Sequence, residues 1–136
     1  LPGAIAASIV HPERRILALC GDAGFMMNVQ EMETAARLGS NIVAFVWADN
    51  AYGLIEWKQD THFGHHTDLN FGNPDWLLLA KAFGWHGHYI DAAEDLQPAL
   101  DGALAEKGPS LVVIPIDYRE NPLLTRKLGE IAALPE

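Results

Sequence analysis

The sequence predicts an α/β protein, a three-layer α/β/α sandwich with a mainly parallel sheet. The first observation is that short apolar runs alternate with amphipathic stretches of helical period along the chain. The second is that these runs are almost continuously apolar, which is typical of strands buried on both faces of a sheet. Strands that alternate with helices are joined by right-handed crossovers, and such crossovers make the strands parallel.

Four short runs are predicted strands because they are apolar and bounded by turn residues. They are residues 16–20, 42–47, 88–90 and 111–116. In a parallel sheet of this kind, ligands bind beyond the carboxyl ends of the strands. The segments that directly follow the strands are therefore the first place to look for a site.

Four amphipathic stretches are predicted helices. Residues 28–38 place their apolar side chains on one side and end before Gly39. In residues 75–83, Pro74 is expected at the helix start with Asn73 as the N-cap. The remaining two helices are residues 1–10 and 94–107.

One stretch, residues 60–73, has no clear period. A loop of this length in a compact domain is usually a functional lid, or is disordered without its ligand. His62, His65 and His66 lie in this loop at a spacing that a transition metal accepts. A solvated role is the stronger expectation for these histidines.

Composition limits the function classes. A chain of 136 residues makes one domain, and Cys20 is its only cysteine, so no intrachain disulfide is expected and a reducing, cytoplasmic setting is favoured. The formal net charge of −9 disfavours nucleic acid as a partner. We expect a soluble protein with no membrane partner, because no run approaches the roughly 20 apolar residues that cross a bilayer.

Two acidic loops carry the strongest functional signal. The segment Gly21-Asp22-Ala23-Gly24-Phe25 follows the first predicted strand, and Asp49-Asn50-Ala51-Tyr52-Gly53 follows the second. Mg²⁺ binds oxygen ligands, typically one or two carboxylates, a carbonyl and phosphate oxygens. Asp22, Asp49 and the main-chain oxygen of Ala51 are therefore candidate ligands of a cation that carries a diphosphate.

The residues beside Asp22 suit a phosphate as well. Gly21, Ala23 and Gly24 are small, so main-chain N–H groups can approach phosphate oxygens there. A helix expected to begin near residue 27 or 28 would direct its positive end the same way. Either loop alone is also explained as an ordinary strand-to-helix turn. Two such loops after neighbouring strands favour a binding site.

The spacing of the two loops resembles the diphosphate-binding motif of thiamine diphosphate enzymes. That motif is a Gly-Asp-(Gly/Ala) sequence followed about 27 residues later by an Asn or Asp, and the interval from Asp22 to Asp49 is 27. Within this superfamily, residues 30–38, 47–52 and 114–123 are similar to acetolactate synthase of the catabolic, FAD-independent type. The resemblance covers nearly the whole chain.

This resemblance implies that the cofactors are thiamine diphosphate and Mg²⁺. The enzyme would decarboxylate pyruvate and join the product to a second pyruvate, giving 2-acetolactate for acetoin or branched-chain amino acid synthesis. It implies metal ligation by Asp22, Asp49 and Ala51. The implied cofactor-binding residues are Gly21, Asp22, Ala23, Gly24, Asp49, Ala51, Tyr52, Gly53 and Leu54, and the implied substrate-pocket residues are Leu54, Ile55 and Lys58. Lys58 departs from the residues expected there, which bears on the choice of the second 2-oxo acid.

The resemblance also concerns what this chain does not supply. Residues 1–136 are similar only to the last domain of a three-domain enzyme, and we expect a C-terminal fragment. The family's catalytic glutamate belongs to the pyrimidine-binding domain of a partner subunit. No catalytic residue is therefore assigned here, the isolated chain is expected to be inactive, and a homodimer or homotetramer is expected.

Two other interpretations stay open. The chain is also compatible with the same domain of another thiamine diphosphate enzyme, such as a benzoylformate-type decarboxylase, a glyoxylate carboligase or a 2-oxo acid oxidase. The other alternative is a non-catalytic α/β assembly module that has lost its ligand. Asp22 and Asp49 argue against that alternative.

Overall fold

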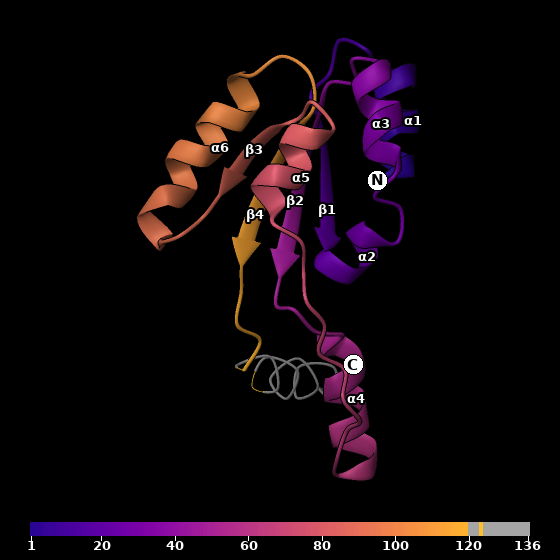
Figure 1. The fold of residues 1–136 in the computed structure, drawn as a ribbon, viewed down its shortest axis with the longest axis vertical. Coiled ribbons are helices and arrows are strands. Elements are labelled where there is room, and N and C mark those ends of the chain that lie inside the picture. The colour runs from indigo at the N-terminus through magenta and orange to yellow at the C-terminus, as the bar shows by residue number, and fades with distance from the viewer. Residues whose placement is uncertain (120–122, 124–136) are drawn as a thin grey trace, which may run out of the picture.

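The sheet of this protein is parallel and has four strands. A computed structural model describes residues 1–119 and 123 of the chain. The strands are β1 (Ile16–Gly21), β2 (Ile42–Ala48), β3 (His86–Tyr89) and β4 (Ser110–Pro115), and their order in the sheet is β1-β2-β4-β3 (Figure 1). Every pairing is parallel. The predicted strands and the predicted fold class are confirmed.

Helices cover both faces of this sheet. The helices of the described residues are α1 (Pro2–Val10), α2 (Asp22–Met26), α3 (Glu31–Arg37), α4 (Gly53–Phe63), α5 (Trp76–Ala82), the 3₁₀ turn η1 (Ala93–Asp95) and α6 (Leu96–Ala105), and all of the α-helices except α4 lie against the sheet (Figure 1). Alternate residues of β2 face opposite layers. Ile42, Ala44 and Val46 pack in the core formed with α1, α2, α3 and α5, whereas Val43 and Phe45 pack in the core on the α6 side. This is the expected three-layer arrangement.

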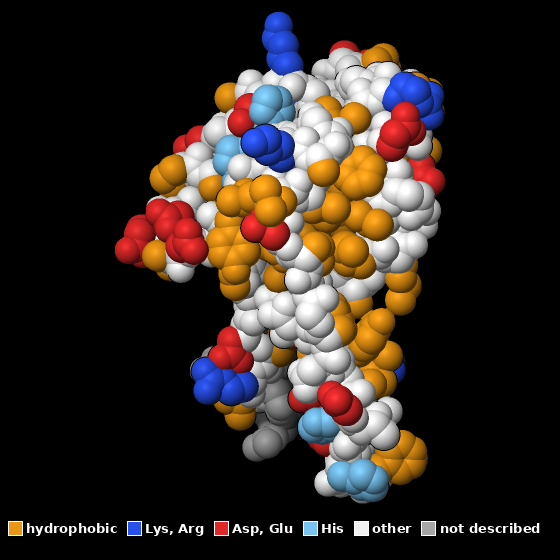
Figure 2. Space-filling model, in the orientation of Figure 1, with side chains coloured by type: hydrophobic (Ala, Val, Ile, Leu, Met, Phe, Trp, Pro, Cys, Tyr) orange, Lys and Arg blue, Asp and Glu red, His pale blue; other side chains and the backbone are white. Residues whose placement is uncertain are grey.

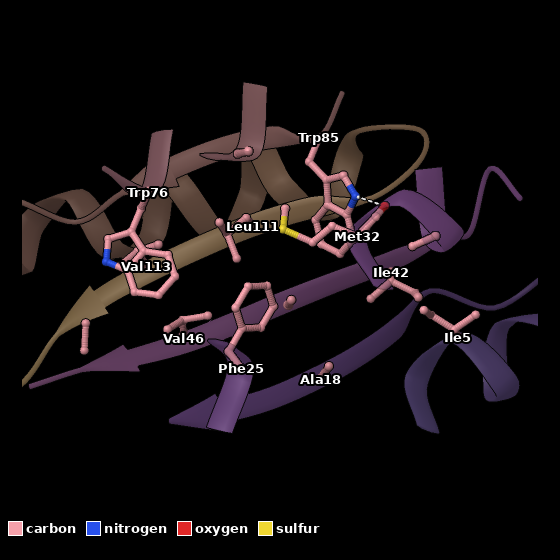
Figure 3. Close-up of a cluster of buried hydrophobic side chains, with 14 residues drawn as sticks. Ile5, Ala18, Phe25, Met32, Ile42, Val46, Trp76, Trp85, Leu111 and Val113 are labelled. Carbon is pink, nitrogen blue, oxygen red and sulfur yellow. Dashed lines mark hydrogen bonds between the residues drawn. The ribbon is translucent and has the colours of Figure 1, made fainter. Parts of the chain in front are cut away.

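The larger core fixes the segment that follows β1. Phe25 of α2 is fully buried and meets the ring of Trp76 edge to face, with 6.1 Å between centroids (Figure 3). The indole N–H of Trp85 donates to the main-chain oxygen of Met32 at 2.9 Å. Aromatic burial of this kind supplies a large share of core stability. It anchors the chain at the end of the first acidic loop, through Phe25, and beyond it, through Met32.

Two predicted helix boundaries were wrong. The helix expected over residues 28–38, with its start near residue 27 or 28, begins only at Glu31, as α3; residues 28 and 29 bond to carbonyls three positions back, and the chain turns there between α2 and α3. The N-cap of α5 is Asp75 and not Asn73, since Asp75 Oδ1 accepts a hydrogen bond from the Leu78 N–H at 2.9 Å. Asn73 is occupied elsewhere.

Helix α4 was not expected from the sequence. None of its residues is buried, so it lacks the apolar stripe that marks a helix. It lies beyond the carboxyl ends of β2 and β4 and ends at Gly64, whose φ of 75° few other residues adopt (Figure 1). Residues 60–63 of the stretch expected as a loop therefore belong to a helix. No helix within the described residues is long and apolar enough to cross a membrane.

Candidate functional site

A large cavity lies at the carboxyl ends of the strands, where the sequence predicts a site. Its volume is about 1020 Å³, and both acidic loops, α4 and the segment after β4 line it. Most residues predicted for cofactor or substrate contact are in its wall: Gly21, Asp22, Ala23, Asp49, Ala51, Tyr52, Gly53, Leu54 and Ile55. Gly24 and Lys58 are exposed and do not belong to the described lining.

Asp22 is the one buried carboxylate in the described lining of this cavity. It is only 2% exposed, at the start of α2. Its Oδ1 accepts a hydrogen bond from the Ala23 N–H at 2.8 Å. Its Oδ2 accepts two, from the Asn50 N–H at 2.9 Å and from the side-chain amide of Asn73 at 2.6 Å. The two acidic loops are thus directly connected through Asp22.

Asp49 is the second carboxylate, and its environment disfavours its charge. Burial raises the pKa of Asp49, and the negative charge of Asp22 raises it further. A weak hydrogen bond of 3.4 Å joins the Ala51 N–H to Asp49 Oδ1. Among the described residues, neither Asp22 nor Asp49 forms an ion pair with Lys or Arg. The two carboxylates therefore hold negative charge that the described protein leaves uncompensated.

The main chain around Asp49 is shaped to leave room for its carboxylate. A Cβ placed on Gly53 would lie 2.6 Å from Asp49 Oδ2, so any other residue would displace this carboxylate. Asn50 has a φ of 60°, in the left-handed region that asparagine tolerates better than most residues. This turn leaves the main-chain oxygen of Ala51 without a donor among the described residues. That oxygen is free for a cation.

The returning segment after α4 forms a third wall of the site. The Tyr52 N–H donates to Leu69 O at 3.1 Å, and the Phe71 N–H donates to Asn50 O at 2.9 Å. The rings of Tyr52 and Phe71 lie 5.1 Å apart. Residues 69–73 are thus fastened to the second acidic loop. The part of the predicted loop that follows α4 lies beside the cavity.

Asn73 and Tyr118 are among the residues at the site that the sequence did not predict. Asn73 contacts Asp22 from 51 positions away in the chain, and no local pattern signals this contact. Tyr118 lines the cavity from the segment after β4. Burial raises the pKa of Tyr118, and the charges of Asp49 and Asp22 raise it further. Its place directly after an apolar strand is the one available signal.

The four tryptophans divide into two groups by position. Trp76 and Trp85 are buried core residues, whereas Trp47 and Trp57 line the cavity.

Glu56 and Asp60 of α4 come together with His66, and their ligand atoms lie within 4.8 Å of one another. His62 and His65 do not belong to this group. Figure 2 shows histidine and acidic side chains gathered at the far end of α4.

The group at α4 contains a basic side chain beside its two carboxylates. His66 Nδ1 lies 2.7 Å from Asp60 Oδ1, and this contact raises the pKa of His66. The imidazole therefore supplies a positive partner for Asp60. Asp22 and Asp49 have no such partner among the described residues. His62, His65 and His66 are all exposed, which agrees with the expected solvated role of these histidines.

The donor set at the acidic loops suits a hard divalent cation. It offers two carboxylates and one main-chain carbonyl, all oxygen, and leaves the remaining positions to phosphate or water. Asp22 and Asp49 have no basic side chain beside them in the described lining, where Arg119 pairs with Asp117. A bare diphosphate would be repelled here, whereas a cation that carries it would be attracted.

Known proteins with similar sequences and structures share this domain. Residues 1–114 match the model of the C-terminal TPP-binding domain of thiamine pyrophosphate enzymes. The catabolic acetolactate synthase of Raoultella terrigena is 40% identical over 94% of this chain and 23% of its own length. The acetolactate synthase of Bacillus subtilis (strain 168) is 34% identical over 96% of this chain and 24% of its own length.

Among solved structures, the thiamine diphosphate-dependent 4-hydroxybenzoylformate decarboxylase of Rhodococcus jostii RHA1 superposes with a TM-score of 0.80 at 26% identity. The match covers 88% of this chain and 23% of that chain. This chain thus spans about a quarter of the length of these relatives. The family match and the structural match point to the same domain. The chain therefore belongs to the C-terminal TPP-binding domain family of thiamine pyrophosphate enzymes.

Proposed function

We propose that this chain binds the diphosphate end of thiamine diphosphate through Mg²⁺. Asp22, Asp49 and the main-chain oxygen of Ala51 would be the protein ligands of the metal. The observation that carries the proposal is the pair of carboxylates in one cavity without a basic partner among the described residues. Two uncompensated carboxylates are costly in a protein unless a cation or a proton joins them.

The surrounding residues would complete the binding of the cofactor. Gly21 and Ala23 carry no large side chain, so phosphate oxygens could approach the main chain of this loop, although the Ala23 N–H itself is donated to Asp22 Oδ1 at 2.8 Å. Leu54 and Ile55 are 67% and 47% exposed, and they would supply an apolar wall next to the diphosphate. The bound cofactor supplies the electron sink for cleavage of a 2-oxo acid, which protein side chains do not provide.

We further propose that the parent enzyme is of the acetolactate synthase type. It would decarboxylate pyruvate and transfer the two-carbon product to a second pyruvate, giving 2-acetolactate. The 40% identity with the catabolic acetolactate synthase over 94% of this chain supports this reaction. A decarboxylase that acts on a larger 2-oxo acid is the second candidate, because the structural match to the 4-hydroxybenzoylformate decarboxylase favours it.

Other parts of the enzyme would supply the catalytic glutamate. The pyrimidine-binding domain of a partner subunit would cover the reactive end of the cofactor, in a homodimer or homotetramer. Leu54 and Ile55 are apolar and exposed beside the cavity, and an exposed apolar surface is stabilised when a partner covers it. They therefore support such a contact. This chain alone would then bind the cofactor without turnover.

Two experiments test this function. Thiamine diphosphate and Mg²⁺ together should raise the melting temperature of this chain, whereas neither alone should do so; at about 100 times Kd the gain is about 2.7 kcal/mol. The enzyme that contains this chain should then form 2-acetolactate from pyruvate. Aldehyde as the sole product would exclude the synthase and favour the decarboxylase.

A further inference from the structure

The side-chain amide of Asn73 joins both acidic loops at one point. Its Nδ2 donates to Asp22 Oδ2 at 2.6 Å and to Asn50 Oδ1 at 2.8 Å. Asn50 in turn donates its main-chain N–H to the same oxygen of Asp22 at 2.9 Å. Three segments that are distant in the sequence therefore meet at Asp22 Oδ2.

The orientation of this amide follows from its partners. If the amide were reversed, Asn73 Oδ1 would face two acceptor oxygens, which is repulsive at these distances. In the observed orientation Asn73 Oδ1 is buried and has no donor among the described residues. An unpaired buried oxygen costs free energy, so the contacts made by Nδ2 must compensate for it.

The hydrogen bonds to Asp22 also limit how it can bind a cation. An ionised carboxylate has about two acceptor positions on each oxygen. Both positions on Oδ2 are taken by the donors from Asn50 and Asn73, whereas Oδ1 accepts only the Ala23 N–H. Asp22 therefore has one position left, on Oδ1, and can offer a cation one oxygen but not two.

This limit matters for the identity of the metal. Mg²⁺ requires a compact octahedron of single oxygen contacts, whereas Ca²⁺ accepts six to eight ligands and often takes both oxygens of a carboxylate. We propose that Asn73 is a positioning residue that holds Asp22 as a one-oxygen ligand and thereby favours Mg²⁺ over Ca²⁺. The inference rests on the proposed function, because it assumes that Asp22 binds the metal of the cofactor.

The test compares the two metals directly. The affinities of Mg²⁺ and Ca²⁺ are measured by calorimetric titration of this chain with saturating thiamine diphosphate. Removal of the partner of a metal ligand commonly costs 10–100-fold in metal affinity, so Asn73→Ala should weaken Mg²⁺ by about that factor. Ca²⁺ should be weakened less, because the freed oxygen becomes available to it, and the preference for Mg²⁺ should fall.

Two further variants make the result specific. Asn73→Asp keeps the size of the side chain, removes the N–H donors and adds an oxygen ligand, so it should shift the preference toward Ca²⁺ even more. Asn28→Ala changes an asparagine of the described residues that donates no hydrogen bond to Asp22 and should leave the preference unchanged. Denaturant unfolding without ligand checks that each variant is folded.

Each outcome decides between the two proposals. If the parent chain binds metal, and Asn73→Ala and Asn73→Asp show the same preference for Mg²⁺ over Ca²⁺ as the parent chain, the role of Asn73 is overturned. The proposed function would then still stand. No binding of either metal by the parent chain would overturn both. A lower preference for Mg²⁺ in both Asn73 variants, with Asn28→Ala unchanged, supports the inference.

Discussion

The two ends of the sheet each carry a cluster of polar side chains, but among the described residues only the cluster at the amino end contains basic side chains. At the amino end, Ser110 Oγ donates to Glu106 Oε2 at 2.9 Å, and His88 Nε2 lies 3.1 Å from the same oxygen. Arg15 donates to Ser110 Oγ at 2.9 Å and to Gly108 O at 2.6 Å. At the carboxyl end, Asp22 and Asp49 find only neutral N–H donors among the described residues.

The carboxylates at the two ends also differ in their pKa shifts: the pKa of Glu106 is lowered, whereas that of Asp49 is raised. Burial acts to raise the pKa of Glu106, but hydrogen bonds with His88 and Ser110 outweigh it, and the pKa lies below its ordinary value. Burial and the charge of Asp22 raise the pKa of Asp49. The amino end is therefore a structural cluster whose carboxylate has imidazole and hydroxyl partners, while Arg15 Nε is buried there without a hydrogen-bond partner among the described residues. The carboxyl end lacks a positive charge, as expected for a site that receives one from a ligand.

Breaking the amino-end cluster should give the largest loss of stability. Arg15→Met removes the donors to Ser110, which is fully buried, and to several carbonyls. We expect the free energy of unfolding to fall by about 2–4 kcal/mol in urea titrations. Arg37→Met is the matched control, because Arg37 forms an exposed ion pair with Glu33, and it should cost less than about 0.5 kcal/mol. Equal losses in the two variants would refute a structural role for the amino-end cluster.

A single methyl group should impair the carboxyl end without unfolding the protein. In Gly53→Ala the new Cβ would meet Asp49 Oδ2 at 2.6 Å, so the carboxylate must move. We expect cation affinity to fall by about 10–100-fold in titrations with thiamine diphosphate, a loss typical of a displaced metal ligand. Gly3→Ala, which meets nothing within 4 Å, should bind like the parent chain. Normal binding by Gly53→Ala would mean that Asp49 is not a ligand.

The two ends should respond to pH in opposite directions. Because the pKa of Asp49 is raised in the folded state, its contribution to stability is present at low pH and is lost as pH rises through that pKa. The pKa of Glu106 is lowered, so its contribution is lost as pH falls. Asp49→Asn should therefore stabilise the ligand-free chain near neutral pH, by less than about 1 kcal/mol given solvent screening. Stability measured from pH 4 to pH 7 tests this sign, and a decrease at neutral pH would contradict it.

The sequence predicts the sheet and the acidic loops well, because both have local signals. Continuous apolar runs indicate the buried strands, and Asp22 and Asp49 follow such runs directly. Helix α4 has no buried side chain, so hydrophobic period could not reveal it. The contact between Asn73 and Asp22 depends on how residues 64–73 return along the second loop, and that path is a tertiary feature.

The difference between the two ends is tested most directly by removing one carboxylate from each. Binding of Mg²⁺ with thiamine diphosphate is titrated in the parent chain, in Asp22→Ala and in Glu106→Gln. We predict that the parent chain and Glu106→Gln bind with similar affinity, and that Asp22→Ala shows no measurable binding although it is folded. Binding by Asp22→Ala as tight as that of the parent chain would contradict a metal site at the carboxyl end of the sheet.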